Sequence, residues 1–389
     1  MKIVYITYHN WDTKRHGGFH QFADFTCRKG IETVFFSFSH PYYIYFKHEE
    51  RENKDVLQKL SRGVDYYLDS EHKLTNVTWP TLALPGFLRK YVSDKLNKYL
   101  LTTSLTSFDS FANKWLDGTD CFVFESHDAV CLVDLVKNKY PNALIVYRPS
   151  DPMLDMRNES YLITGEKEVL KKADLVICVN KGGKELFEET YPEVDSSKYC
   201  IVSNGVALGD FLKDYPKPSS MPKGKNALFI GASPIDWDSV MFAANKLPDV
   251  NFIVISPASQ PRNSLQSIKQ YENIIYIPGI PPTEVAAWVT NADIIIQPIP
   301  KETGRYNKKS LSITAQNYKA MAARKFIVAY MGPQTFSDYG IISTYSHQDF
   351  AEAIKNNIGK VANYSIDLES KNWDKVCQLF LEEIKSKIR

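Results

Sequence analysis

The sequence predicts an α/β protein built from two successive doubly wound units. Short apolar runs rich in β-branched residues alternate with helical patterns, a proline-rich stretch interrupts this alternation, and the alternation then starts again. Continuous apolar strands separated by helices are typical of a parallel sheet that is covered on both faces. We therefore expect two Rossmann-like domains that face a cleft.

The first domain is expected to span residues 1–206. Its strands are predicted at 2–7, 32–38, 121–125, 144–147, 175–179 and 199–202, with helices at 19–29, 129–139, 166–172 and 181–188. Each strand is a short β-branched or aromatic run, and each helix shows apolar residues at helical spacing. Residues 40–118 interrupt the pattern and contain no clear strand.

The stretch 86–101, GFLRKYVSDKLNKYLL, is predicted as a single helix. One side of this helix would carry the apolar and aromatic residues Leu88, Tyr91, Val92, Leu96 and Tyr99. Of the cations, Arg89 and Lys98 would flank this side, Lys95 would lie within it and Lys90 would lie away from it. It could be a surface helix that packs on the sheet. Together with HPYYIY at 40–45, it could instead bind an anionic membrane surface.

The second domain is expected after a linker at 207–225, which contains YPKPSSMPKGK. The domain would span 226–370, with strands at 226–230, 251–255, 274–277, 293–297 and 326–330 and helices near 238–246, 282–290, 314–323 and 348–358. A further helix near 372–385 lies in a C-terminal segment, 371–389, that could cross back to the first domain.

Composition excludes several classes of protein. The 47 Lys and Arg residues nearly balance the 45 Asp and Glu residues, for a net charge of +2, so we expect no nucleic-acid partner. The six cysteines contain no CxxC pair, which argues against a disulfide scaffold or structural zinc. No long apolar run or leader pattern is present, so we expect a cytoplasmic protein.

Asp151 is the candidate general base. The segment YRPSD at 147–151 follows the strand predicted at 144–147, and a carboxylate at the carboxyl end of a parallel strand faces the crevice where substrates bind. The alternative is a helix N-cap, because Ser150, Asp151 and Pro152 are typical capping residues.

Two segments of the second domain are candidates for binding a diphosphate. Gly231, Ala232 and Ser233 follow the strand at 226–230, where small residues let backbone N–H groups approach a phosphate. Four of the nine residues at 301–309 are cations, which could stabilise a leaving diphosphate or simply form a solvated basic loop. Asp236-Trp237-Asp238 is a pattern that holds a metal in some enzymes, but Asp238 as a helix N-cap is the favoured interpretation, so we expect no metal site.

Several segments, in this order, resemble the inverting GT-B glycosyltransferases of the GumK glucuronosyltransferase family. SNGV at 203–206 with Phe211 is similar to the interdomain PNGVD…F of GT-B glycosyltransferases in general, although an ordinary turn is the alternative. YKAMAAR at 318–324 is similar to EAMACGT of the wider GT-B superfamily, with Lys319 in place of Glu and Arg324 in place of Gly. An ordinary helix with Ala-Met packing is the alternative. YRPSD is similar to YRASD, GASPID at 231–236 to GSMLFD, and GFHQFAD at 18–24 to the family's first helix.

The resemblance implies roles for individual residues. Asp151 would be the catalytic base, and Lys309 or Lys319 would replace the family's phosphate-binding lysine, which falls opposite Thr314 or Gln316. The implied donor-binding residues are Gly231, Ala232, Ser233, Ile280, Arg305, Tyr306, Lys309, Gln316 and Lys319, and the implied acceptor-binding residues are Gly18, His20 and Arg148.

The implied activity is an inverting, metal-independent transfer of a sugar, with glucuronate as the family's sugar, from a UDP-sugar to a saccharide acceptor. The acceptor is expected to be lipid-linked, in cell-surface polysaccharide synthesis at the inner face of the membrane, with no cofactor. Two alternatives stay open: an epimerase-like nucleotide-sugar enzyme of the same fold, or a non-catalytic nucleotide-sugar-binding protein in which Asp151 only caps a helix.

Overall fold

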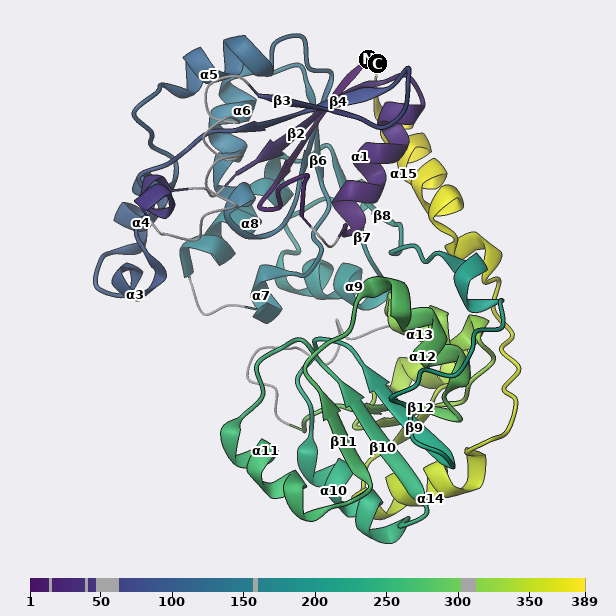
Figure 1. The fold of residues 1–389 in the computed structure, drawn as a ribbon. Coiled ribbons are helices and arrows are strands. Elements are labelled where there is room, and N and C mark those ends of the chain that lie inside the picture. The colour runs from purple at the N-terminus through teal and green to yellow at the C-terminus, as the bar shows by residue number, and fades with distance from the viewer. Residues whose placement is uncertain (14–15, 39–40, 47–62, 157–159, 302–312, 389) are drawn as a thin grey trace. The chain divides into compact units, whose positions relative to one another are not determined.

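The computed structural model describes residues 1–13, 16–38, 41–46, 63–156, 160–301 and 313–388. The chain divides into two compact units (Figure 1). The first unit comprises Met1–Ser203 together with Val376–Arg389, and the second comprises Asn204–Lys375. Among the described residues, no helix combines the length and the apolar character that crossing a membrane requires.

The first unit is built on an eight-stranded sheet with the order β3-β4-β2-β1-β5-β6-β7-β8. The strands are β1 (Lys2–Thr7), β2 (Glu32–Ser37), β3 (Val64–Tyr67), β4 (Lys73–Thr78), β5 (Cys121–Phe124), β6 (Leu144–Tyr147), β7 (Leu175–Cys178) and β8 (Tyr199–Ile201). All neighbours are parallel except β3 and β4. The central strands β5 and β6 are apolar throughout, and β1 is apolar between Lys2 and Thr7, because both faces of the sheet are covered.

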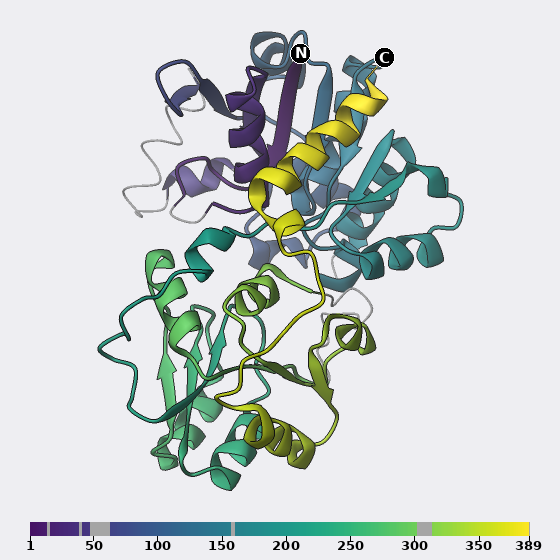
Figure 2. The ribbon, with the colours of Figure 1, turned by 90° about the vertical axis from the view of Figure 1, so that its right-hand side faces the viewer.

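The helices of the first unit cover the two faces of this sheet. They are α1 (Gly18–Arg28), α3 (Gly86–Arg89), α4 (Asp94–Leu101), α5 (Phe108–Trp115), α6 (Val133–Lys139), α7 (Met153–Met156), α8 (Ser160–Lys172) and α9 (Lys181–Thr190). Figure 2 shows α15 (Trp373–Lys387) beside α1, where Phe380 stacks on Phe22 with ring centroids 4.1 Å apart. The C-terminal residues of the chain therefore complete the core of the first unit.

The expectation that residues 40–118 contain no strand is wrong. β3 and β4 form an antiparallel pair, and β4 joins the edge of the sheet beside β2. Both strands contain many polar residues and β3 is at most half-buried, because it lies at the sheet edge. Their sequences therefore lack the continuous apolar run that marks the central strands.

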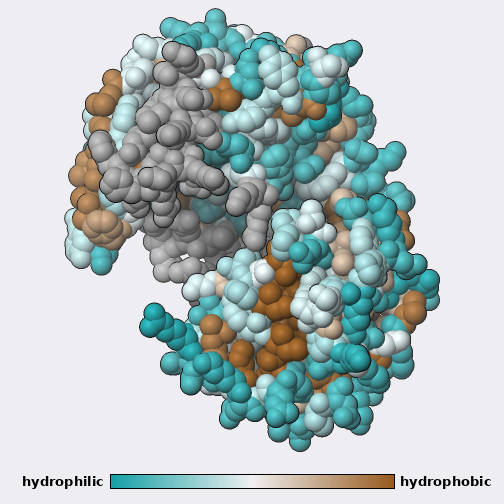
Figure 3. Space-filling view, viewed as in Figure 1, coloured by the Kyte–Doolittle hydropathy of each residue, from teal (hydrophilic) through white to brown (hydrophobic). Residues whose placement is uncertain are grey.

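The single helix expected at 86–101 is also wrong, since α3 ends at Arg89 and α4 begins at Asp94. Ser93 caps α4, and its hydroxyl oxygen accepts a hydrogen bond from the Leu96 amide at 3.3 Å. Phe87, Tyr91 and Tyr99 are nonetheless 70%, 74% and 61% exposed. Figure 3 shows apolar residues at the surface where Figure 1 labels α3 and α4.

The second unit is built on a six-stranded parallel sheet with the order β11-β10-β9-β12-β13-β14. The strands are β9 (Lys225–Ile230), β10 (Val250–Ile255), β11 (Ile274–Ile277), β12 (Ile294–Pro298), β13 (Ile327–Tyr330) and β14 (Ile342–Thr344). The helices are α10 (Trp237–Lys246), α11 (Arg262–Ser267), α12 (Val285–Asn291), α13 (Ala315–Ala322) and α14 (His347–Asn357). β14 and α11 were not predicted, because each is short and contains few apolar residues.

The stretch expected as a linker, 207–225, packs on the second unit. Leu208, Phe211 and Met221 are buried in its core. Just before them, a Cβ atom on Gly205 would lie 2.5 Å from the Trp373 ring, so only glycine allows this approach. The SNGV segment thus has a packing role within the second unit.

The strand orders fix where a ligand can bind in each unit. In the first sheet the order reverses between β1 and β5, and in the second it reverses between β9 and β12. Ligands of doubly wound folds bind beyond the carboxyl ends of the strands at such switch points. The expected ligand sites therefore lie beside the polar residues that end β1 and β5, and beside the loops that follow β9 and β12.

Candidate active site

A buried polar cluster lies beyond the carboxyl ends of β1, β5 and β6. Glu125, which directly follows β5, accepts hydrogen bonds from the hydroxyl groups of Thr7 at the end of β1 and of Ser150 after β6, the latter at 2.6 Å. Arg148 and Asp151 are the other charged members of this cluster. Residues far apart in sequence meet here because β1, β5 and β6 are neighbours in the sheet.

Asp151 is an exposed residue next to this cluster, as its place after β6 predicts. Its backbone amide donates to the Ser126 hydroxyl oxygen at 3.5 Å. Surrounding protein atoms desolvate the carboxylate and raise the pKa of Asp151, while the nearby Arg148 charge acts in the opposite direction. An accessible carboxylate with a raised pKa, beside a switch point, suits a general base.

Arg148 does not lie where the predicted acceptor contact requires it. Its side chain is 0% exposed, and its guanidinium carbon lies 5.0 Å from the centre of the Phe22 ring. Burial lowers the pKa of Arg148 to about 10, and the neighbouring Glu125 and Asp151 charges oppose that shift. Arg148 can therefore act on Asp151 electrostatically, whereas its burial argues against direct contact with an acceptor.

His20 is buried as well, so its position argues against the predicted acceptor contact. The ring Nδ1 accepts from the Gly17 amide at 3.2 Å, and Nε2 donates to the Asn10 carbonyl oxygen at 2.9 Å. These bonds fix the start of α1, and burial lowers the pKa of His20 to about 4. Gly18, the first residue of α1, is only half-buried.

Glu166 on α8 is a second buried carboxylate that the sequence analysis did not identify. It accepts from the Tyr147 hydroxyl at 2.6 Å and from the Met153 amide at 2.9 Å. The Asp151 loop is thus held on both sides, by Glu125 through Ser150 and by Glu166 through Met153. Glu166 lies one helical turn after Leu162 and one turn before Leu170, and this spacing on the buried face could have revealed it.

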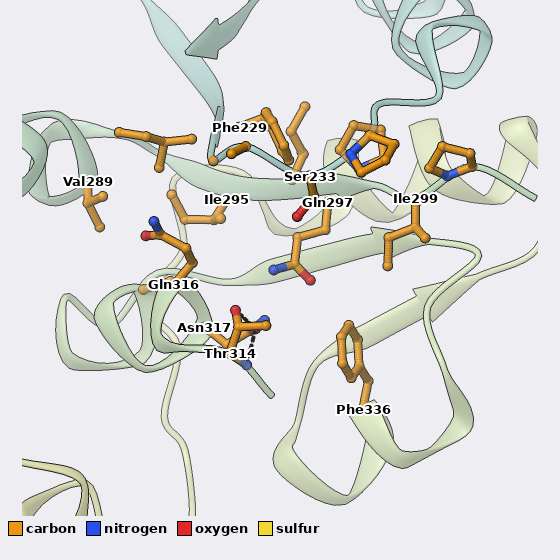
Figure 4. Close-up of a pocket in the computed structure, with 18 residues that line it drawn as sticks. Phe229, Ser233, Val289, Ile295, Gln297, Ile299, Thr314, Gln316, Asn317 and Phe336 are labelled. Atoms are coloured by element: carbon orange, nitrogen blue, oxygen red, sulfur yellow. Dashed lines mark hydrogen bonds between the residues drawn. The ribbon is translucent and has the colours of Figure 1, made fainter. Parts of the chain in front are cut away.

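The second unit contains a pocket of about 220 Å³ beyond β9 and β12. Its lining is largely apolar and includes Phe229, Val289, Ile295 and Phe336 (Figure 4). α13 begins at the pocket, where the Thr314 amide and hydroxyl both donate to the Asn317 side-chain oxygen, at 2.9 and 2.8 Å. The positive end of this helix favours an anionic group.

Three amide side chains bring polar atoms to this pocket. Figure 4 places Gln297, Gln316 and Asn317 around the same space. Within the described part of the chain, Gln297 Oε1, Gln316 Oε1 and Asn317 Nδ2 are buried and have no hydrogen-bond partner. Buried amides of this kind are costly unless a partner satisfies them, which a polar ligand in the pocket would do.

The predicted donor-binding residues have different positions. Gly231, Ala232, Ser233 and Gln316 line the pocket, whereas Ile280 and Lys319 are not among its lining residues. Lys319 lies 5.7 Å from the centre of the Phe211 ring, and burial lowers its pKa, so it is badly placed to neutralise a diphosphate in this pocket. Arg305, Tyr306 and Lys309 lie outside the described residues.

The Gly231 amide is not available to a phosphate, because it donates to the Ile255 carbonyl oxygen at 3.1 Å. The helix cap was also assigned to the wrong aspartate: Asp236 is the N-cap of α10 and accepts from the Ser239 amide at 2.8 Å. Asp238 lies in the first helical turn, where the helix dipole stabilises its negative charge. Helix capping therefore accounts for the Asp-x-Asp pattern.

Comparisons with known proteins agree with these features. Residues 5–179 match the family model of the glucuronosyltransferase GumK N-terminal domain. A UDP-glucuronate:glycolipid 2-beta-glucuronosyltransferase from Xanthomonas campestris pv. campestris is 25% identical over 256 residues, which cover 64% of this chain and 58% of that protein. The match thus spans less than two thirds of that relative's length.

Solved structures resemble this chain over its whole length. A UDP-forming trehalose-phosphate synthase from Burkholderia xenovorans covers 100% of this chain and 99% of its own, with a TM-score of 0.62 and 11% identity. A glycosyltransferase from Rickettsia africae covers 100% and 94%, with a TM-score of 0.56 and 14% identity. The predicted fold class, two Rossmann-like domains of the GT-B type, is confirmed, and so is the resemblance to the GumK glucuronosyltransferase family.

Proposed function

We propose that this protein is a glycosyltransferase that uses a UDP-sugar and acts with inversion and without a metal ion. The observation that carries the proposal is Asp151, an accessible carboxylate with a raised pKa that follows β6, the strand next to the switch point, in a unit that matches the GumK N-terminal domain. The 25% identical relative acts on UDP-glucuronate and a glycolipid, which supports glucuronate and a lipid-linked saccharide as substrates.

The reaction would proceed by a single displacement. The Asp151 carboxylate removes the proton from an acceptor hydroxyl, whose oxygen attacks the anomeric carbon of the donor. The bond from that carbon to the diphosphate oxygen breaks on the opposite face, so UDP leaves and the configuration inverts. The amino end of α13 and the cations of 301–309 would stabilise the charge on the diphosphate.

The proposal is tested by incubating the protein with a panel of UDP-sugars, with and without a lipid-linked saccharide. Mass spectrometry detects the product, and NMR assigns its anomeric configuration. Transfer that requires acceptor supports the proposal. Conversion of the donor without acceptor would indicate an epimerase-like enzyme, and binding without turnover would indicate a non-catalytic protein.

Transfer is expected to continue in EDTA. The Asp236 carboxylate is engaged as a helix cap, and helix ends and cationic side chains can supply the positive charge that a metal provides in other enzymes. The measurement compares initial rates before and after exhaustive chelation. Loss of activity that Mg²⁺ or Mn²⁺ restores would contradict metal independence.

We also propose that the surface of α3 and α4 docks on an anionic membrane. Phe87, Tyr91, Leu96 and Tyr99 are exposed there, and Lys90 and Lys95 are exposed cations. Arg89 and Lys98, which were expected to contribute cations to this surface, are instead engaged within the protein. Arg89 donates to the Tyr161 hydroxyl oxygen at 3.0 Å, and the Lys98 ammonium lies 3.3 Å from the Asp134 carboxylate. Lys90 and Lys95 are therefore the residues to change.

Replacing Lys90 and Lys95 by Glu is expected to abolish sedimentation with vesicles of phosphatidylcholine and phosphatidylglycerol at low salt. Each cation near an anionic surface contributes about 1 kcal/mol, so the double reversal removes a large part of a weak interaction. A matched control replaces the exposed Lys181 and Lys213 by Glu and should sediment like the original protein. Equal sedimentation of all three proteins would mean that this surface does not bind membranes.

A further inference from the structure

Glu125 is a buried carboxylate for which the proposed reaction has no role so far. Glu125 is 1% exposed. One of its carboxylate oxygens accepts a hydrogen bond from the Thr7 hydroxyl, and the other accepts one from the Ser150 hydroxyl at 2.6 Å. Ser150 directly precedes Asp151, so this bond connects the switch point of the sheet to the residue proposed as base.

The charged and titratable groups around Glu125 come from every strand end that borders it. His9, after β1, has Nε2 3.8 Å from a Glu125 oxygen, and burial lowers its pKa, which keeps it neutral near pH 7. Arg148 and Asp151, from the segment after β6, interact with Glu125 through their charges. Arg148 interacts with both carboxylates, and each carboxylate favours the charged form of Arg148.

We propose that Glu125 is a positioning residue for the transfer reaction. Glu125 holds the loop that carries Asp151 through its hydrogen bond with Ser150, and both carboxylates interact with the positive charge of Arg148. This inference rests on the proposed function. An ionised Glu125 partly neutralises Arg148 and repels a second negative charge, and both effects favour the protonated form of Asp151. Asp151 is then a stronger base than it would be beside Arg148 alone.

The position of Glu125 makes this effect depend on pH. Burial raises the pKa of Glu125 to about 7, although the Ser150 and Thr7 hydrogen bonds and the Arg148 charge oppose the shift. Glu125 therefore gains its negative charge as the pH rises through neutrality. The rate of transfer should respond there, in addition to the response at the lower pH where Asp151 itself ionises.

The test compares the pH profile of kcat for the original protein, Glu125→Gln and Ser150→Ala. Glutamine keeps an oxygen that can accept a hydroxyl hydrogen bond but removes the charge, so the inflection near pH 7 should disappear and kcat at pH 8 should fall about tenfold. Ser150→Ala breaks the link but keeps the charge. Its kcat should fall similarly while the inflection near pH 7 persists.

Thermal unfolding and UDP affinity are measured for each variant, because a merely structural role would alter stability without removing an inflection. Glu32→Gln serves as the control, because Glu32 lies at the amino end of β2, whereas Glu125 lies beyond the carboxyl ends of the strands. This variant should behave like the original protein. If Glu125→Gln does not fold, Ser150→Ala decides: an unchanged kcat in that variant overturns the proposal.

Two outcomes separate this inference from the proposed function. If Asp151→Asn lacks transfer but Glu125→Gln keeps both its kcat and the inflection near pH 7, Glu125 has no positioning role and the proposed function stands. If the original protein transfers no sugar from any UDP-sugar tested, the proposed function fails and this inference fails with it.

Discussion

Asp151→Asn is expected to reduce the rate of sugar transfer by about 10²–10⁴-fold, the usual contribution of a general base. Asparagine has nearly the same shape but cannot accept a proton from the acceptor hydroxyl. UDP affinity should not change, because the candidate nucleotide pocket is formed entirely by residues of the second unit. The free energy of unfolding should not fall either, since the change removes a charge that its surroundings desolvate.

The measurement is the initial rate with saturating UDP-sugar and acceptor, together with UDP affinity by calorimetry. Asp109→Asn is the matched control, because Asp109 is an exposed carboxylate on α5 that forms an ion pair with Lys139 at 3.1 Å. That control should keep the full rate. An Asp151→Asn protein with a near-normal rate would remove Asp151 from the mechanism, and transfer would then need another base.

The pH dependence of the reaction follows from the same carboxylate. The pKa of Asp151 is raised above its usual value, so Asp151 is protonated and inactive at a higher pH than an ordinary aspartate would be. The rate should therefore fall on the acid side of the profile, and Arg148 limits how far toward neutrality this fall extends.

The sequence was sufficient to predict the parts of the site that local patterns determine. β6 is a continuous apolar run, and its boundary alone placed Asp151 at the carboxyl edge of a parallel sheet. Gly231 and Ser233 were located in the same way from β9. The criterion that singled out Asp151 applies equally to Glu125, which follows β5, so that residue could have been found from the sequence.

Other features depend on contacts between distant segments and are not visible in local patterns. The bond between Thr7 and Glu125 joins residues 118 positions apart, and it exists because β1 and β5 are neighbours across the switch point. The resemblance implied that His20 and Arg148 bind the acceptor, but the packing of α1 buries both. Likewise, the burial of Lys319 against Phe211 depends on how residues 207–225 fold onto α13.

Gly231→Ala is expected to weaken UDP binding at least tenfold, about 1.4 kcal/mol, without affecting the fold. Gly231 lines the pocket, and a Cβ atom added there would meet only the Phe229 ring, at an ordinary contact distance of 3.7 Å. The hydrogen bond from the residue 231 amide to the Ile255 carbonyl oxygen is kept. A methyl group therefore fits the free protein, and it interferes only when a diphosphate approaches the backbone at this point.

The measurement is UDP affinity by calorimetry together with the thermal unfolding temperature. Gly209→Ala is the control, because Gly209 belongs to the same unit, does not line the pocket and has open space where a Cβ atom would lie. It should bind UDP normally. If Gly231→Ala binds UDP as well as this control does, the diphosphate does not pass close to Gly231. The nucleotide would then have to be held mainly by the amino end of α13 and the amides of Gln297, Gln316 and Asn317.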